Sequence, residues 1–305
     1  MGIIDTLSAG FRLVFRRPWL AVVPLLIDLG VWLGPKLSMS MIVEQMLASL
    51  TSWSAGLAGS DQTVSEAVGN MVDVLQETVA RTNLLGLLAW NSLGVPSVGA
   101  RLPIQASDRV IQISQFWQLV VIETAILAVG LLLAAAYLIL IGRNVSGQTL
   151  TMRGFPGTIV EAWARLALIL VVIGVGVASA SLASAILGPL SLVVFIGLMW
   201  ILLYISFFPQ AITLAGHKPL PAILSSYWVV RTSLWPTLGL LLLVNLLDTG
   251  LALVWQRLMG TASLGMLLAI IASSLIGTGL TAALSYFYRD RLGALRDLVT
   301  APKET

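Results

Sequence analysis

Six long apolar stretches run through this 305-residue chain, and few charged residues interrupt them. The clearest stretch covers residues 117–141, where Glu123 is the only charged residue. A hydrocarbon core of about 30 Å requires roughly 20 apolar residues in an α-helix. A soluble domain of this size has no use for six such segments. The sequence therefore predicts an all-α, polytopic membrane protein, a helix bundle with six transmembrane helices.

The composition agrees with lipid as the main solvent. Hydrophobic residues make up 58% of the chain and charged residues 10%, whereas soluble proteins carry about 25% charge. The net charge of +3 is small, so we expect the lipid bilayer and not nucleic acid as a partner. The absence of cysteine excludes disulfides, thiolate metal sites and cysteine nucleophiles.

The apolar stretches divide the chain into four parts. We expect spans at about 19–37, 117–141, 160–186, 190–211, 235–255 and 262–287. The expected parts are an N-terminal amphipathic helix with the first span (1–43), an external helical segment (44–116), five further spans with an interfacial helix near 220–234 (117–288), and a cytoplasmic tail (289–305).

Two segments outside the spans have helical periodicity. Apolar residues recur on one face of residues 3–17, at Ile3, Ile4, Leu7, Phe11, Val14 and Phe15. This pattern predicts an amphipathic helix that lies on the membrane. In the external segment, a capping box at 63–66 precedes an apolar stripe that ends at Val79. The apolar patch 83–90 is too short to span, and we expect it to pack against that helix or enter the interface.

The distribution of Lys and Arg predicts the orientation. If both termini share one side, that side holds twelve of the 17 basic residues and the other side five. The positive-inside rule then places both termini in the cytoplasm, in a bacterial cytoplasmic membrane by our interpretation. Five arginines are candidates for contact with anionic lipid headgroups, although the topology alone explains them equally well: Arg12, Arg16, Arg17, Arg289 and Arg291.

Three carboxylates lie within or near the spans: Asp28, Glu123 and Asp248. A charge inside the bilayer costs a few kcal/mol even on the most lenient scale, so such residues usually have a purpose. One interpretation is a proton or cation site. The other is structural, with each carboxyl group close to an interface or hydrogen-bonded to a neighbouring helix.

Small residues four apart allow two helices to approach closely in lipid. They occur here at Gly130, Ala134, Gly174, Gly176, Ala178, Ala180, Ser273 and Gly277. The pattern does not distinguish packing within the chain from packing against a partner.

Motifs for common catalytic chemistry are missing. The sequence has no P-loop, no HExxH and no GxSxG. The single histidine, His217, has no neighbouring ligands with which to form a usual metal site. We therefore expect no catalytic residues, no metal and no cofactor.

The opening residues, GFRLVFRRPWLAVVPLLIDL, resemble the start of several uncharacterised bacterial six-span membrane families. They are also similar in outline to the membrane domain attached to some glycerophosphodiester phosphodiesterases. The catalytic domain of those enzymes has no counterpart here, so the resemblance implies an architecture and no catalytic residue.

Two functions remain open. The first is a non-catalytic scaffold or accessory subunit that contacts protein partners through its transmembrane faces or through the external segment 60–95. The alternative is a permease or channel-like transporter that uses Asp28 and Asp248. A lipid-modifying enzyme ranks last, since nucleophile and base candidates are lacking.

Overall fold

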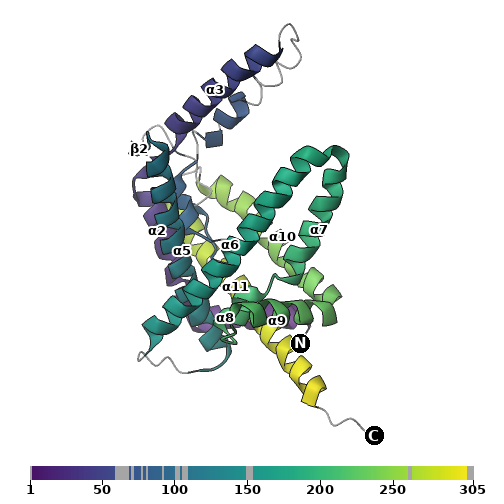
Figure 1. Cartoon of the computed structure of the whole chain (residues 1–305). Coiled ribbons are helices and arrows are strands. Elements are labelled where there is room, and N and C mark those ends of the chain that lie inside the picture. Colours follow the sequence, from purple (N-terminus) through teal and green to yellow (C-terminus); the bar gives the residue numbers. More distant parts are fainter. Residues whose placement is uncertain are drawn as a thin grey trace. The chain divides into compact units, whose positions relative to one another are not determined.

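The computed structural model describes residues 2–58, 69, 72–76, 78–79, 82–90, 93–99, 104, 109–148, 154–259 and 263–300, and most of these are helical (Figure 1). The chain forms two compact units. The first comprises residues 1–23, 90–96 and 131–305, and the second comprises 24–89 and 97–130. Five segments are long and apolar enough to cross a bilayer: Phe116–Val145, Phe155–Ser184, Ser191–Thr213, Leu234–Met259 and Ser263–Asp297. The predicted class of helical membrane protein is confirmed.

The first expected span is shorter than predicted. A 3₁₀ turn, Pro18–Ala21, leads into helix α2 (Val22–Leu33), and together they form an apolar segment of fewer than 18 residues. The helix ends because Pro35 disfavours helical backbone at the residue before it. The ammonium group of Lys36 then donates to the carbonyls of Val31 (2.6 Å) and Trp32 (2.8 Å) and closes the helix. Residues 36–38 form a strand and do not continue the span.

Helix α11 (Ser263–Thr300) packs along helix α1 (Ile3–Arg16) in the first unit. A Cβ atom at Gly10 would lie 2.4 Å from the carbonyl oxygen of Gly279 and 2.7 Å from the backbone nitrogen of Ala283. The two backbones are therefore in contact, which only glycine permits. At 1.5 Å per residue, α11 is about 57 Å long. It continues as a helix through residues 289–300, where the sequence predicted a separate tail.

Most residues of α1 that are buried in the protein lie outside the apolar stripe predicted to face the membrane. Thr6, Gly10, Leu13 and Val14 are buried, whereas Ile4 and Phe15 are 77% and 78% exposed. Close backbone contact needs small residues, so the helix turns its small face towards α11. Ile4 and Phe15 are left facing outward, where lipid is the expected solvent.

Helices α6 (Phe155–Leu187) and α7 (Ser191–Tyr204) form a hairpin in the first unit (Figure 1). Gly188 has a φ of +54° in the connecting turn Gly188–Leu190, a backbone conformation that favours glycine. The tight turn predicted at this Gly-Pro pair is confirmed. A helix is present near 220–234, as the sequence predicted: it is α9 (Pro219–Thr232), and α10 (Leu234–Met259) follows it.

The fourth expected span is not continuous. Helix α7 ends at Tyr204, residues 205–207 form a turn, and a short helix α8 (Phe208–Thr213) follows. Pro209 explains the break, because its ring clashes with the carbonyl four residues earlier, that of Ile205, in an unbroken helix. The predicted span is therefore a pair of helices with irregular backbone between them.

The second unit contains structure that the sequence did not predict. Strands β1 (Lys36–Ser38) and β2 (Val110–Gln112) pair in parallel, with Lys36 opposite Val110. Helix α3 (Ser40–Ala58) follows β1, and a 3₁₀ turn covers Leu84–Leu88. The side-chain oxygen of Asn83 accepts from the backbone nitrogens of Leu37 (3.0 Å) and Leu85 (3.2 Å) and so ties this turn to the strand.

The apolar patch 83–90 lies in the core of the second unit. Leu84 packs with Ile42 of α3, with Ile113 after β2, and with Ile126 of helix α5 (Phe116–Val145). The patch therefore packs, but this cluster does not include the helix ending at Val79 that the sequence predicted as its partner. The capping box at 63–66 lies outside the described residues. Of the helix predicted after it, residues 69, 72–76 and 78–79 are described, and they are helical.

Candidate functional site: a polar cavity beside a broken helix

A cavity of about 510 Å³ lies in the first unit, and we call it the broken-helix cavity. Apolar side chains from α6, α7, α10 and α11 make up most of its wall. Its polar residues are Ser206, Gln210, Asn245, Asp248 and Thr281. The volume falls within the range of small-molecule sites, which are also largely apolar with a few polar groups.

The α7–α8 break is held open by α9. The buried hydroxyl of Ser226 donates to the carbonyl of Tyr204 (2.9 Å) and accepts from the backbone nitrogen of Phe207 (3.0 Å). These are the backbone groups that the break would otherwise leave unpaired. The Phe207 ring also stacks on Phe287 and Tyr288, with ring centroids 5.6 and 6.1 Å apart. The irregular backbone is therefore a stable feature.

Two polar atoms beside the break are unsatisfied. The Oγ of Ser206 and the Oε1 of Gln210 are buried and have no hydrogen-bond partner among the described residues. Gln210 as a whole is 4% exposed. An unpaired buried acceptor costs about 1–3 kcal/mol. Because both residues line the cavity, a bound molecule with hydrogen-bond donors could satisfy them.

Three further polar side chains of the cavity come from α10 and α11. Asn245 and Asp248 are three residues apart on α10 and so lie on one face of that helix. The Thr281 hydroxyl lies within hydrogen-bond distance of the carbonyls of Gly94 and Gly277. Of the described residues that line the cavity, only Asp248 has an ionisable side chain.

Asp28 lies in the second unit and holds a loop. Its fully buried carboxylate accepts hydrogen bonds from the Ser97 hydroxyl and from the backbone nitrogens of Val98 and Gly99, the latter two at 3.0 Å. A Cβ atom at Gly99 would lie 2.9 Å from the Asp28 oxygen, so glycine is needed for this approach. Asp28 and Asp248 thus belong to different units. Glu123 is half-buried in α5 and does not line the broken-helix cavity.

The small residues predicted to pack helices fall into two groups. Some make close contacts inside a unit. A Cβ at Gly130 would lie 2.6 Å from the Leu88 carbonyl, one at Gly277 would lie 2.1 Å from the Pro96 Cβ, and Ala134 and Ser273 are buried. The others are on α6. Apart from adjacent residues and the backbone of α6 itself, no described atom lies within 4 Å of a Cβ placed at Gly174 or Gly176. Ala178 is exposed, and Ala180 is half-buried.

The five arginines predicted to meet lipid headgroups also differ. Arg17 donates to the side-chain oxygen of Asn144, and Arg289 donates to the carbonyl of Val145, at the C-terminal end of α5. A cation is favoured there by the helix dipole. Arg291 stacks over the Phe287 ring at 5.2 Å. Arg12 and Arg16 are exposed on α1.

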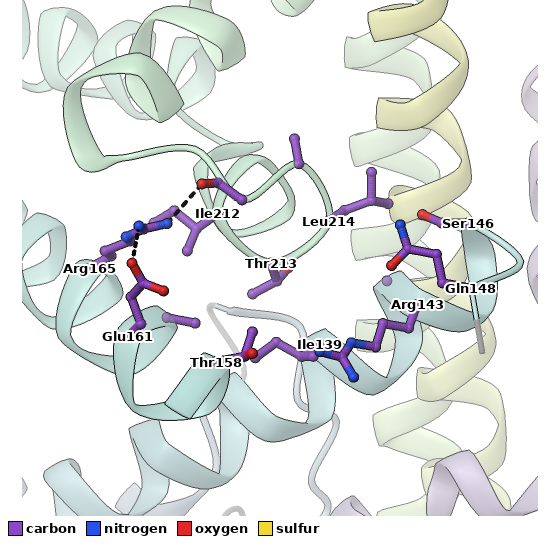
Figure 2. Close-up of a pocket in the computed structure, with 14 residues that line it drawn as sticks. Ile139, Arg143, Ser146, Gln148, Thr158, Glu161, Arg165, Ile212, Thr213 and Leu214 are labelled. Atoms are coloured by element: carbon purple, nitrogen blue, oxygen red, sulfur yellow. Dashed lines mark hydrogen bonds and ion pairs between the residues drawn. The ribbon is translucent and has the colours of Figure 1, made fainter. Parts of the chain in front are cut away.

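A second pocket of about 300 Å³ lies between the end of α5, the start of α6 and residues 212–216 (Figure 2). Figure 2 shows Arg165 between Glu161 and the loop after α8. Arg165 forms an ion pair with Glu161 and donates to the carbonyls of Gly216 (2.8 Å) and His217 (3.2 Å). Arg143 lies over the Phe155 ring at 5.1 Å. Both cations of this pocket have protein partners, whereas the broken-helix cavity contains two buried side-chain oxygens, of Ser206 and Gln210, without a hydrogen-bond partner among the described residues. We therefore favour the broken-helix cavity as the candidate site.

In the part of the chain that the structure describes, no group of three or more His, Cys, Asp or Glu side chains is placed to hold a metal ion. Comparison of the chain with protein-family models, with curated proteins and with solved structures found no match. The site must therefore be interpreted from its own geometry.

The sequence prediction included Asp248 but missed Ser206, Gln210 and Asn245. A signal for the first two was present, because Pro209 lies inside an apolar stretch and two polar residues flank it within three positions. A proline in a helical pattern ends or kinks the helix. In a membrane, the freed backbone must then face protein or a cavity.

Proposed function

We propose that this protein is a permease or channel-like transporter whose solute passes through the broken-helix cavity, with Asp248 as the principal binding residue. The observation that carries this proposal is the combination of a carboxylate with unsatisfied Ser206 and Gln210 at a break in a membrane helix. Broken helices line the solute sites of many transporters, because their ends present polar groups at membrane depth.

The proposal includes a membrane arrangement. The short helix Pro18–Leu33 and the five longer segments together form six spans. The membrane is a bacterial cytoplasmic membrane, and both termini lie in the cytoplasm. The basic residues of α1 and the end of α11 support this orientation. In this arrangement Asp28 is not a transport residue. It positions the 97–99 loop through its three hydrogen bonds.

The test measures solute flux into proteoliposomes by two assays. A trapped pH-sensitive dye reports proton movement after a pH step, and osmotic swelling reports the entry of neutral solutes. In at least one assay, the rate with the wild-type protein should exceed the rate in empty liposomes. With Asp248→Asn, the rate should fall to that of empty liposomes. Glu123→Gln is the matched control, since it also amidates a membrane carboxylate but lies outside the cavity. Equal rates for the wild-type protein and Asp248→Asn would contradict the proposal.

A second function has one specific observation in its favour. On the α6–α7 hairpin, Gly174 and Gly176 are open to the outside, as described above. A partner helix could approach this face closely, as an accessory subunit requires. Under this alternative, Gly174→Ile with Gly176→Ile should reduce the native size of the protein after mild detergent extraction. An unchanged size would remove this face from consideration.

A further inference from the structure

We propose that the broken-helix cavity selects a small organic cation, a protonated amine with an apolar body. The inference rests on the proposed function and adds the chemical class of the solute. It starts from the polar groups that the cavity presents. The Ser206 Oγ and Gln210 Oε1 are buried acceptors without a partner in the described structure. An ammonium group carries only donors, so it complements acceptors of this kind.

The charge of the cavity favours a cation over a neutral donor. Asp248 is a carboxylate in a membrane helix, and the other described residues lining the cavity are neutral. An anion would meet the carboxylate without a basic side chain in the lining to offset the repulsion. A bound cation would instead be attracted to the carboxylate.

The rest of the wall favours an organic cation over a bare metal ion. Leu170, Ile173 and Val177 of α6, Leu241 and Val244 of α10, and several further leucines line the cavity. A cavity of about 510 Å³ is far larger than one ion, and its apolar surface gains free energy by covering hydrocarbon. Ca²⁺ takes about six to eight oxygen ligands, whereas the cavity presents one carboxylate and four neutral polar side chains.

The test measures binding and not flux. The purified full chain in mild detergent is heated while tryptophan fluorescence is followed, with increasing concentrations of three probes of similar shape. The probes are cyclohexylammonium, cyclohexanol and cyclohexanecarboxylate. A ligand that binds the folded state raises Tm with concentration, and the concentration dependence gives its Kd. We expect cyclohexylammonium to raise Tm, and the carboxylate to leave it unchanged.

Variants distinguish binding at the cavity from an effect of the probes on the detergent. Asp248→Asn should weaken cyclohexylammonium binding by at least about tenfold, since it removes the charge partner. Ser206→Ala and Gln210→Leu each should weaken it by a smaller factor, and they test the site if Asp248→Asn fails to fold. Glu123→Gln should bind like the wild-type protein. Equal Tm shifts from all three probes, or equal binding by wild type and all cavity variants, would overturn the inference.

The two proposals can fail separately. Cyclohexylammonium binding that depends on Asp248, together with no flux in liposomes, would keep the cation site and contradict transport. Flux that depends on Asp248, together with no ammonium binding, would keep the transporter and overturn the class of solute.

Discussion

Helix α11 and the α6–α7 hairpin are similarly apolar and very differently packed. The mean hydropathy of their most apolar windows is 2.0 for Ser263–Asp297, 2.5 for Phe155–Ser184 and 2.4 for Ser191–Thr213. Yet 50% of the α11 window is buried, against 11% in each hairpin window. Hydropathy thus identifies helices that belong in a membrane. It does not identify the helices that form the core.

Small residues account for the difference. Two glycines of α11 lie close against other elements, Gly277 against Pro96 and Gly279 against the Phe11 ring. The glycines of α6 face outward. Lipid tails are as apolar as leucine, so the hydrophobic effect does not bring membrane helices together, and close packing must do so. The same small-residue pattern therefore builds the core in one region and leaves an open surface in the other.

The largest expected effect comes from the same substitution made in both regions. Gly10→Ala places a methyl group against the backbone of Gly279 and Ala283, and such overpacking costs about 1–3 kcal/mol. Gly174→Ala meets no described atom and should stabilise α6 by up to about 1 kcal/mol, because alanine is the better helix former. Unfolding in mixed detergent and denaturant measures both. Equal destabilisation by the two variants would break the comparison.

A smaller effect is expected from one hydroxyl group. The Tyr137 hydroxyl donates to the Thr278 hydroxyl at 3.2 Å, in the contact between α5 and α11, and both residues are buried. Tyr137→Phe should lower the free energy of unfolding by about 1 kcal/mol. Tyr204→Phe, at the end of α7, is the control and should change it by less than about 0.5 kcal/mol. A larger loss of unfolding free energy from Tyr204→Phe than from Tyr137→Phe would contradict this role of the Tyr137 hydroxyl.

The smallest expected effect concerns pH and the loop that follows α8. Burial lowers the pKa of His217 below its usual 6.5, and the positive charge of Arg296 on α11 lowers it further. The unfolded chain therefore binds this proton more readily than the folded protein. Stability should be full above pH 6.5 and should decrease as the pH falls through the lowered pKa. A modest drop in Tm between pH 7.5 and 5.5 should be reduced in His217→Gln, and an unchanged pH profile in that variant would contradict this role.

The sequence predicted the elements better than their contacts. Membrane helices, the Gly188 turn and the α9 helix follow from local pattern, because apolar length, glycine and periodicity act within a few residues. The parallel pairing of Lys36 with Val110 joins residues more than seventy positions apart and leaves no local pattern in either strand. The buried face of α1 was also missed, since it depends on where Gly279 lies and not on the hydrophobicity of α1.

The candidate site divides in the same way. Asp248 was identifiable because a carboxylate in an apolar stretch stands out. Gln210 and Ser206 line the cavity because the helix breaks at Pro209. Ser226, on another helix, stabilises this break by hydrogen bonding to its free backbone groups. Asp28 looked equivalent to Asp248 in the sequence. Only the hydrogen bonds from the 97–99 loop distinguish its structural role.

The central claim is that water and cations reach the broken-helix cavity. The chain has no cysteine, so single-cysteine variants need no prior substitution. The two variants are Ser206→Cys, in the cavity, and Val193→Cys, on the outer face of α7. Membranes containing each variant would be treated with two thiol reagents, the cationic trimethylammonium-ethyl methanethiosulfonate and the anionic sulfonato-ethyl methanethiosulfonate. We predict that Ser206→Cys reacts with the cationic reagent at least about tenfold faster than Val193→Cys does. It should also react faster with this reagent than with the anionic one, and cyclohexylammonium should protect it. A Ser206→Cys variant as unreactive as Val193→Cys would contradict the account.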